Sequence, residues 1–350
     1  MDSNQSWAWS GGMGVGILVA CVVVLAACRL QAAQPGDKGK ASGVKLVSVK
    51  RIWDKGAHNA FTGLMRHEGL FYCTFREADG HVKGDGKIRV ITSKDGETWA
   101  SAALLAEDGI DLRDPKISVI PDGRFMIVAG GSVYRGGKYK GRQPRVTFSK
   151  DGRTWTPTQR ILSEGEWLWR VTWQGKKAYG VSYNRDAYKA KKREWSQMLL
   201  VSDDGVHYDK ICDLKVDGFA GETTLRFTDD GTMIAIVRRE SGDKKGWIGT
   251  SEKPYTEWRW HETEHHLGGP DFIILPDGGM WAGSRSYPGG AKTVLVRFGP
   301  TTYEPVLTLP SGGDTSYPGF VWHDGLLWMS YYASHEGKTS IYLAKIRVPR

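Results

Sequence analysis

Polar residues recur at the start of six strand-like runs that are otherwise mostly hydrophobic. These positions are Asn59, Arg113 with Asp114, Arg170, Glu222, Asp271 and Tyr317. Three further arginines, Arg76, Arg238 and Arg285, stand at the ends of neighbouring runs. Several guanidinium groups around a Glu and a Tyr would attract a carboxylate or a sulfate, because the guanidinium fork matches those groups in bidentate geometry. The alternative for each single position is that strand ends are simply polar and exposed to water.

A repeated pattern locates these positions along the chain: a turn glycine followed by an apolar run. The six glycines are spaced by 54, 52, 56, 47 and 47 residues, and are Gly69, Gly123, Gly175, Gly231, Gly278 and Gly325. One β-meander per unit, without a helical period, predicts an all-β fold: a six-bladed β-propeller of four-stranded antiparallel blades. The innermost strands of a propeller start at one mouth of the channel, so the polar residues would share one pocket. A solenoid of stacked meanders also satisfies the period, but no capping repeats are visible.

A second repeat places an Asp-Gly turn after a strand-like run. Thr92–Trp99 is echoed by Phe148–Trp155, more loosely by Val201–Tyr208, and most weakly by Thr250–Glu252 followed by Trp258. Gly accepts a positive φ and Asp can bond its own backbone, so each copy suits a hairpin turn. We expect the Trp of each copy to pack back over its turn.

The composition predicts a globular chain with many short strands. Its 350 residues are 40% hydrophobic and include 45 Gly, 15 Trp and 14 Tyr, which argues against disorder and against a fibrous repeat. A formal net charge of +9 admits nucleic acid, anionic lipid or a small acidic ligand as partner. Because the basic residues are scattered along the chain, we expect no nucleic-acid partner.

The N-terminus reads as an export signal. The apolar run 12–27 ends in Leu25-Ala26-Ala27-Cys28, which resembles a bacterial lipobox. That resemblance implies a signal peptide over 1–28, lipidation at Cys28, a flexible tether over 29–44, and a membrane-anchored protein of the cell envelope. The first eleven residues carry an acidic residue and no Lys or Arg, unlike a usual signal, and an uncleaved anchor helix is the alternative. Cys73 and Cys212 are then expected to be free, buried thiols.

Residues 45–350 resemble the sialidase (neuraminidase) superfamily. The Asp-Gly turns are similar to its Asp boxes, although one residue shorter between Asp and Gly than the commonest form. The resemblance implies a general base at Glu222, a nucleophile at Tyr317 and an acid/base at Asp85, which lies in Gly84-Asp85-Gly86. It also implies that Arg238 and Arg285 belong to a carboxylate-binding triad. On this basis the chain would be an exo-glycosidase that removes terminal acidic sugars and needs no cofactor.

One position departs from the family pattern. The first strand reads His58-Asn59-Ala60-Phe61, so Asn59 replaces the first arginine of the triad. The loss of a bidentate contact costs on the order of 2–3 kcal/mol unless Arg76, Arg113 or Arg170 replaces it.

Two other functions therefore stay open. The propeller could bind acidic glycans without cleaving them, or it could be a glycosidase for another sugar, in which Asn59 and His58 bind a hydroxyl group instead of a carboxylate. Purely structural roles stay open too, because Tyr317 could be a core aromatic residue, Asp85 a turn residue and Glu222 a cap for backbone amides. Arg238 and Arg285 could form salt bridges between blades. We expect a glycan as substrate and a monomeric protein.

Overall fold

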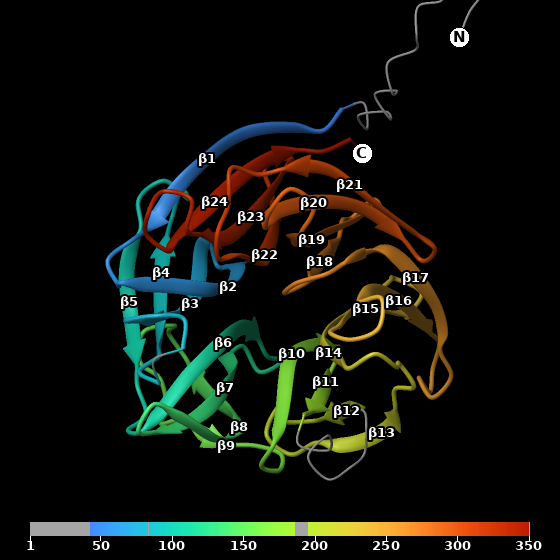
Figure 1. Ribbon diagram of the computed structural model, residues 1–350, viewed down its shortest axis with the longest axis horizontal. Coiled ribbons are helices and arrows are strands. Elements are labelled where there is room, and N and C mark those ends of the chain that lie inside the picture. The colour runs from blue at the N-terminus through green and yellow to red at the C-terminus, as the bar shows by residue number, and fades with distance from the viewer. Residues whose placement is uncertain (1–42, 83, 186–194, 350) are drawn as a thin grey trace, which may run out of the picture. The chain divides into compact units, whose positions relative to one another are not determined.

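The structure is a computed structural model that describes residues 43–82, 84–185 and 195–349. These residues form six four-stranded sheets and contain no helix. The sheets are arranged as blades around a central axis, with β2, β6, β10, β14, β18 and β22 innermost (Figure 1). The prediction of an all-β, six-bladed propeller is confirmed.

Each of the first three blades is a meander of consecutive antiparallel strands. Blade 1 holds β2 (His58–His67), β3 (Leu70–Ala78), β4 (Lys87–Ser93) and β5 (Ala100–Leu105). Blade 2 holds β6 (Ile110–Val119), β7 (Phe125–Arg135), β8 (Lys138–Ser149) and β9 (Gln159–Arg160). Blade 3 holds β10 (Glu166–Gln174), β11 (Lys177–Asn184), β12 (Ser196–Ser202) and β13 (Asp209–Asp213).

The last three blades follow the same order, except that the sixth borrows one strand. Blade 4 holds β14 (Ala220–Phe227), β15 (Met233–Arg239), β16 (Lys245–Ser251) and β17 (Arg259–His266). Blade 5 holds β18 (Asp271–Ile274), β19 (Met280–Ser286), β20 (Lys292–Gly299) and β21 (Thr302–Thr308). Blade 6 holds β22 (Thr315–His323), β23 (Leu326–Ala333), β24 (Ser340–Arg347) and β1 (Lys45–Trp53).

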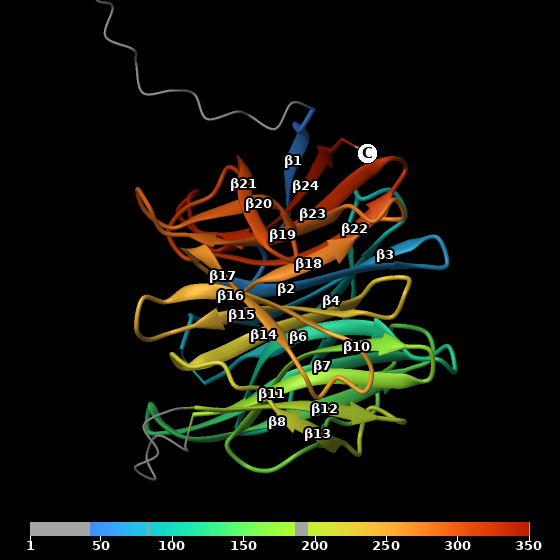
Figure 2. The ribbon, with the colours of Figure 1, turned by 90° about the vertical axis from the view of Figure 1, so that its right-hand side faces the viewer.

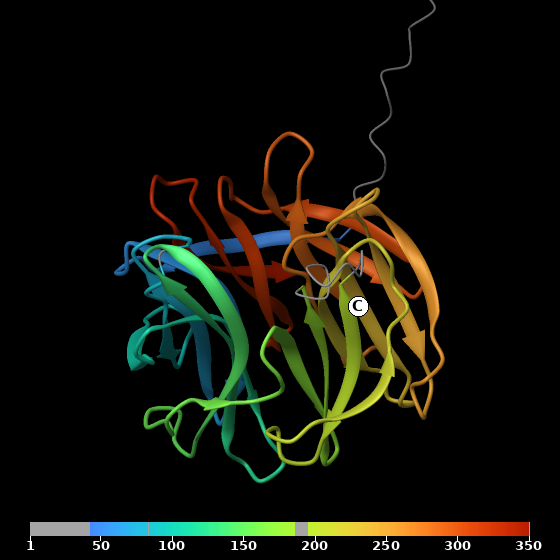
Figure 3. The ribbon, with the colours of Figure 1, turned by 60° about the horizontal axis from the view of Figure 1, so that its bottom comes forward.

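The ring is closed by pairing the first strand with the last. β1 is the outer strand of blade 6 and runs antiparallel to β24, from the Lys45↔Arg347 pair to the Trp53↔Ile341 pair. Figure 2 shows β1 beside β24 from the side, and the tilted view of Figure 3 shows the same blue and red strands together. Blade 6 is therefore complete only when both ends of the propeller sequence are in place.

Burial decreases from the inner to the outer strand of a blade. The first seven residues of β2 and of β22 are all buried, whereas β5, β13 and β21 have no fully buried residue. A strand covered on both faces requires a continuous apolar run, and an outer strand does not. For this reason the apolar runs on either side of the turn glycines correspond to the inner strands of each blade.

The Asp-Gly turns are held by short local hydrogen bonds. In the first, Asp95 Oδ1 accepts from the backbone N–H of Glu97 at 2.8 Å and of Thr98 at 2.9 Å. Trp99 donates its indole N–H to the Gly96 carbonyl at 3.1 Å, so it lies back over the turn as expected. Gly96 has φ +71°, and a Cβ there would lie 2.2 Å from the ring of Trp328 in blade 6, so only glycine fits.

The same bonds recur at Asp151 and Asp204, which accept from the two backbone N–H groups that follow the turn glycine. These backbone donors lower the pKa of Asp95 and that of Asp151 to about 2. The worn fourth copy has no aspartate, and Ser251 donates instead to the Glu257 carbonyl at 2.6 Å.

The expectations for the N-terminal segment, including Cys28, fall on residues outside the described ranges. Within those ranges no helix is long and apolar enough to cross a membrane. Cys73 and Cys212 are free thiols there, as expected. Cys73 is buried, but Cys212 is only partly buried, because it lies on the outer strand β13.

Candidate active site

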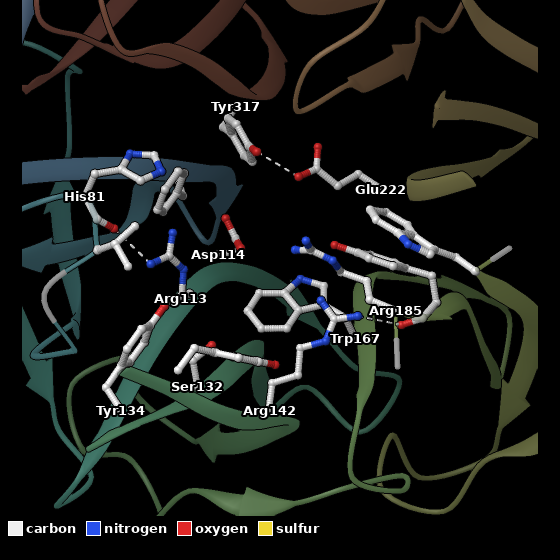
Figure 4. A pocket seen from close by; sticks show the side chains of 15 residues that line it. His81, Arg113, Asp114, Ser132, Tyr134, Arg142, Trp167, Arg185, Glu222 and Tyr317 are labelled. Carbon is white, nitrogen blue, oxygen red and sulfur yellow. Dashed lines mark hydrogen bonds between the residues drawn. The ribbon is translucent and has the colours of Figure 1, made fainter. Parts of the chain in front are cut away.

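A pocket of about 580 Å³ opens at the centre of the ring, mainly against blades 1, 2 and 3. Figure 4 shows the Tyr317–Glu222 pair on one side, Asp114 in the middle, and Arg113 and Arg142 on the other side. The lining residues are Phe61, His81, Val82, Arg113, Asp114, Ser132, Tyr134, Tyr139, Arg142, Trp167, Tyr183, Arg185, Trp195, Glu222 and Tyr317.

Bulges in the inner strands bring several of these residues into the pocket. The register of β2, β6, β10, β14 and β22 with its neighbour strand shifts at one point near the start of each strand. Phe61, Asp114 and Tyr317 lie in three of these bulges with φ values of 67°, 51° and 54°. A bulge aims a side chain away from the regular alternation, and a left-handed conformation costs roughly 1–3 kcal/mol for such residues. Bulges of this kind are common beside active sites.

Tyr317 and Glu222 form a buried hydrogen-bonded pair between blades 6 and 4. The phenol of Tyr317 donates to Glu222 Oε1 at 2.7 Å. Arg238, on β15, donates from Nη1 to Glu222 Oε2 at 2.8 Å and to the Tyr317 oxygen at 3.0 Å. Glu222 Oε2 also accepts from the backbone N–H of Gly269 at 2.9 Å. Arg238 and Gly269 thus fix the carboxylate while it faces the phenol.

The electrostatics of the pair keep the proton on Tyr317. Burial raises the pKa of Tyr317 well above 10.0, and the charge of Glu222 raises it further. Burial alone would raise the pKa of Glu222 too, but the charge of Arg238 and hydrogen bonds from Arg238 and Tyr317 outweigh it, and the pKa lies below its ordinary value. An ionised carboxylate therefore contacts a neutral phenol, which is the arrangement a general base needs toward a nucleophile.

Asp114 is the second acid of the pocket lining. It is 8% exposed, and its Oδ1 has no hydrogen-bond partner among the described residues. Burial raises its pKa, while the charges of Lys116 and Arg113 oppose that shift. A carboxyl group that keeps its proton toward higher pH can donate that proton to a leaving group.

Lys116 is a buried cation near Tyr317 and is not part of the pocket lining. Its Nζ donates to the Thr62 carbonyl at 2.8 Å and lies 5.0 Å and 5.9 Å from the ring centroids of Trp169 and Tyr317. Burial, followed by the charge of Arg170, lowers the pKa of Lys116 to about 7.

The predicted carboxylate-binding arginines do not form an open cluster. Asn59 is fully buried, and its amide donates to the carbonyls of Gly56 and Thr339, both at 2.9 Å. Arg285 donates to the Thr315 carbonyl at 2.7 Å and to the Tyr332 phenol at 3.2 Å. Neither residue is part of the pocket lining, and Arg238 is bound to the Tyr317–Glu222 pair.

Arg76 and Asp85 also lie outside the pocket lining. Arg76 is fully buried and donates to Asp111 Oδ1 at 2.7 Å. Asp85 accepts a 2.8 Å hydrogen bond from the backbone N–H of Asp79, and one of its oxygens lies 3.8 Å from Arg76. The structure therefore does not bring Asp85 to the Tyr317–Glu222 pair.

Arg170 and Asp271 pair with each other instead of lining the pocket. Arg170 Nη2 lies 3.1 Å from Asp271 Oδ2, and Arg226 donates to the other oxygen at 2.8 Å. This buried ion pair joins inner strands β10 and β18. Of the ten rim residues proposed from the sequence, the pocket lining contains Arg113, Asp114, Glu222 and Tyr317.

A histidine that the sequence reasoning missed also lines the pocket. His81 Nδ1 lies 2.6 Å from Asp314 Oδ2, and His58 Nε2 lies 3.2 Å from the same oxygen. Tyr332 donates to Asp314 Oδ1 at 2.7 Å. Although burial opposes it, the hydrogen bonds from His58 and His81 hold the pKa of Asp314 well below its usual range.

His58, His81 and Asp314 also form a group that could hold a metal ion, since one donor atom from each lies within 4.8 Å of the others. Hydrogen bonds already join the three, so the group holds together without an ion. No pattern in the sequence separated His81 from the other polar residues of its loop.

No protein-family model and no curated protein matches the chain. Several solved structures are similar to the chain. A protein of unknown function from Dyadobacter fermentans DSM 18053 has a TM-score of 0.78 at 18% identity and covers 88% of this chain and 100% of its own. The α-L-arabinofuranosidase Arb93A of Fusarium graminearum has a TM-score of 0.67 at 13% identity, over 86% of this chain and 98% of its own.

Trypanosoma rangeli sialidase has a TM-score of 0.65 at 12% identity and covers 83% of this chain and 55% of the sialidase chain. At these identities the likeness shows the fold alone. The propeller of this chain is the one found in sialidases and in that arabinofuranosidase.

Proposed function

We propose that the protein is a glycoside hydrolase that removes terminal acidic sugars from glycans through a covalent intermediate on Tyr317. The observation that carries the proposal is the 2.7 Å hydrogen bond from the Tyr317 phenol to Glu222, two residues that line the central pocket. Proteins named as a sialidase and as an arabinofuranosidase share the fold, which supports glycoside chemistry on this frame.

In the first step Glu222 takes the phenolic proton, and the Tyr317 oxygen attacks the anomeric carbon as the glycosidic C–O bond breaks. Arg238 donates to the same phenolic oxygen and stabilises the developing phenolate. Asp114 gives its proton to the leaving oxygen. In the second step Asp114 takes a proton from water, the water oxygen bonds to the anomeric carbon, and Tyr317 leaves and regains its proton from Glu222.

Asp114 takes the role of proton donor here in place of Asp85, for two reasons. Asp114 lines the pocket with Tyr317, whereas Asp85 does not. Burial also raises the pKa of Asp114, which favours the protonated form that the first step requires.

The test is hydrolysis by the purified full-length protein of 4-methylumbelliferyl glycosides of N-acetylneuraminic acid, glucuronic acid and arabinofuranose. We expect turnover of an acidic glycoside, and a tyrosine-linked glycosyl adduct at Tyr317 after incubation with the matching fluorinated sugar. Turnover without an adduct at Tyr317 would contradict the mechanism. Binding of acidic sugars without any turnover would establish the glycan-binding alternative, and turnover of the arabinofuranoside alone would establish a glycosidase for a neutral sugar.

We also propose that Cys28 carries a lipid that anchors the protein in the cell envelope, as the Leu25–Cys28 sequence suggests. Metabolic labelling with a fatty acid should disappear in a Cys28→Ala variant and persist in a Cys21→Ala variant. Labelling that survives Cys28→Ala would rule the anchor out.

A further inference from the structure

The wall of the pocket in blades 2 and 3 combines arginines with aromatic rings, and the proposed reaction uses none of them. Arg113 comes from β6 and Arg142 from β8, and the rings of Trp167 and Tyr183 come from β10 and β11. In the view of Figure 4, Arg113, Arg142 and Trp167 lie on the other side of Asp114 from the Tyr317–Glu222 pair. We call Arg113, Arg142, Trp167 and Tyr183 the arginine wall.

Arg142 is a buried cation held in a fixed orientation. It is 6% exposed and lies 5.1 Å and 4.8 Å from the ring centroids of Trp167 and Tyr183. Its Nε donates to the Gly165 carbonyl at 3.0 Å and its Nη2 to the Tyr183 carbonyl at 3.1 Å. Among the described residues nothing accepts from Nη1. No carboxylate of those residues forms an ion pair with Arg142, so within the described part of the chain this buried charge is balanced only by carbonyl groups and aromatic rings.

Arg113 offers a second set of unused donors in the same wall. Only its Nη1 is bonded among the described residues, to the His81 carbonyl at 2.9 Å and to Asp111 Oδ2 at 3.2 Å. The guanidinium lies 5.1 Å from the Phe61 ring centroid, which holds its plane against the pocket surface. Its partner Asp111 also accepts from Arg76, so one carboxylate serves two guanidinium groups.

The charge of the pocket lining is divided between its two sides. The acidic residues of the lining are Asp114 and Glu222, and burial raises the pKa of Asp114, which favours its neutral form. The arginine wall carries two permanent positive charges beside flat aromatic rings. Guanidinium forks bind carboxylate and sulfate, and aromatic faces pack against the C–H faces of sugar rings.

We propose that the arginine wall binds the carboxylate or sulfate of an acidic glycan, through Arg113 and Arg142, while the bond to be cleaved lies at Tyr317. This inference rests on the proposed function for the position of the reacting bond. It moves the recognition of the anion from Arg238 and Arg285, where the sequence had placed it, to blades 2 and 3.

The test measures binding without turnover, in the Tyr317→Phe background. Three probes separate the sources of charge: a hyaluronan tetrasaccharide carries only carboxylates, 6-sulfo-N-acetyllactosamine carries only a sulfate, and N-acetyllactosamine carries neither. Isothermal titration calorimetry gives the Kd of each probe. We expect one or both anionic probes to bind about 10- to 100-fold more tightly than the neutral one, as charge-assisted hydrogen bonds predict.

Arg142→Ala and Arg113→Ala should each remove most of that preference. Because Arg142 packs between two rings, Arg142→Lys is the second variant: it keeps a charged stem but loses the fork, and an intermediate Kd is expected. Arg124→Ala is the matched control, since Arg124 pairs with Asp122 in an exposed turn. Equal Kd values for all three probes, or an anion preference that survives both alanine variants, would overturn the proposal.

The two proposals can fail separately. Anion binding that depends on Arg142, in a protein that hydrolyses no glycoside, leaves the arginine wall standing and rejects the hydrolase. Hydrolysis of glycosides by the parent protein, together with no preference for anionic probes, rejects the arginine wall and leaves the hydrolase standing.

Discussion

The phenolic oxygen of Tyr317 lies 2.7 Å from Oε1 of Glu222, although 95 residues separate the two in the sequence. One residue comes from the inner strand of blade 6 and the other from the inner strand of blade 4. Arg238 contacts both, so a third group holds the pair in place.

Removal of the phenolic oxygen should abolish catalysis and leave the fold intact. Tyr317→Phe keeps the ring that packs on Phe61 at 4.9 Å, but it removes the atom that attacks the sugar in the proposed reaction. We expect kcat to fall at least about a thousandfold, measured with the best aryl glycoside. Tyr342→Phe is the control, because it removes a phenol that bonds Glu336 away from the pocket. A Tyr317→Phe protein with more than a tenth of parental activity would exclude the nucleophile.

The proton donor can be identified from the leaving group. Asp114→Asn should lower kcat/KM by about 10²- to 10⁴-fold for glycosides with a poor leaving group. The loss should be much smaller for a 2,4-dinitrophenyl glycoside, whose departure needs no proton. Asp85→Asn should leave both rates within a fewfold of the parent, because Asp85 lies outside the pocket lining. The opposite pattern would return the role to Asp85.

The plot of kcat/KM against pH should rise as Glu222 ionises and fall as Asp114 loses its proton. Glu222 must be ionised, and because its pKa is lowered from 4.5, the rising limb should lie below that pH. Asp114 must be protonated, and because its pKa is raised from 3.8, the falling limb should lie above that pH. Asp114→Asn should abolish the falling limb. Burial lowers the pKa of Lys116 to about 7, so an inflection of the profile near pH 7 that disappears in Lys116→Met comes from Lys116. A falling limb that persists in Asp114→Asn and Lys116→Met alike would contradict the assignment.

The Asp-Gly turns should make stability depend on acid. The pKa of Asp95 is lowered from 3.8 to about 2 by backbone hydrogen bonds, so its ionised form stabilises the folded state. That contribution is complete above the unfolded pKa and is lost as the pH falls through the folded one. Asp95→Ala should lower Tm at neutral pH, and its difference from the parent should shrink between about pH 4 and pH 2.

Asp108→Ala, at an exposed position, serves as the control for this variant. Thermal unfolding at several pH values gives the comparison. A difference between Asp95→Ala and the parent that stays constant down to pH 2 would show that the turn carboxylate does not act through its charge.

The turn glycines predicted the inner strands well. Each of the six positions read back from a glycine lies on the strand of its blade nearest the axis, as for Asn59 on β2 and Tyr317 on β22. This worked because an inner strand is covered on both faces and must be a continuous apolar run, so a polar residue at its start stands out.

The direction of each side chain could not be predicted in the same way. A bulge of one residue reverses the alternation of a strand, and the residues 60–63 of β2 contain such a shift. Phe61 therefore lines the pocket while Asn59, two residues earlier, bonds to backbone carbonyls in the interior. Nothing in the order of residues shows which peptide takes the positive φ.

The loop between β3 and β4 was the other obstacle. It contains Asp79, His81 and Asp85, and the resemblance selected Asp85 from its place before the first Asp-Gly turn. The structure turns His81 toward the pocket and Asp85 toward the backbone of its own loop. Arg142 and Trp167 were missed because they come from two blades and meet only in the folded ring.

The pairing of β1 with β24 has a consequence for the order of folding. Each of the first five blades can form from a continuous stretch of chain, since its four strands are consecutive. Blade 6 needs Lys45 and Arg347 side by side, a contact between distant parts of the sequence that is slow to form. Until then β24 has an unpaired edge, open to strands of other molecules. The ring can therefore close only after the chain is free as far as Arg347, and until that moment the edge of β24 is the part of the propeller most open to aggregation.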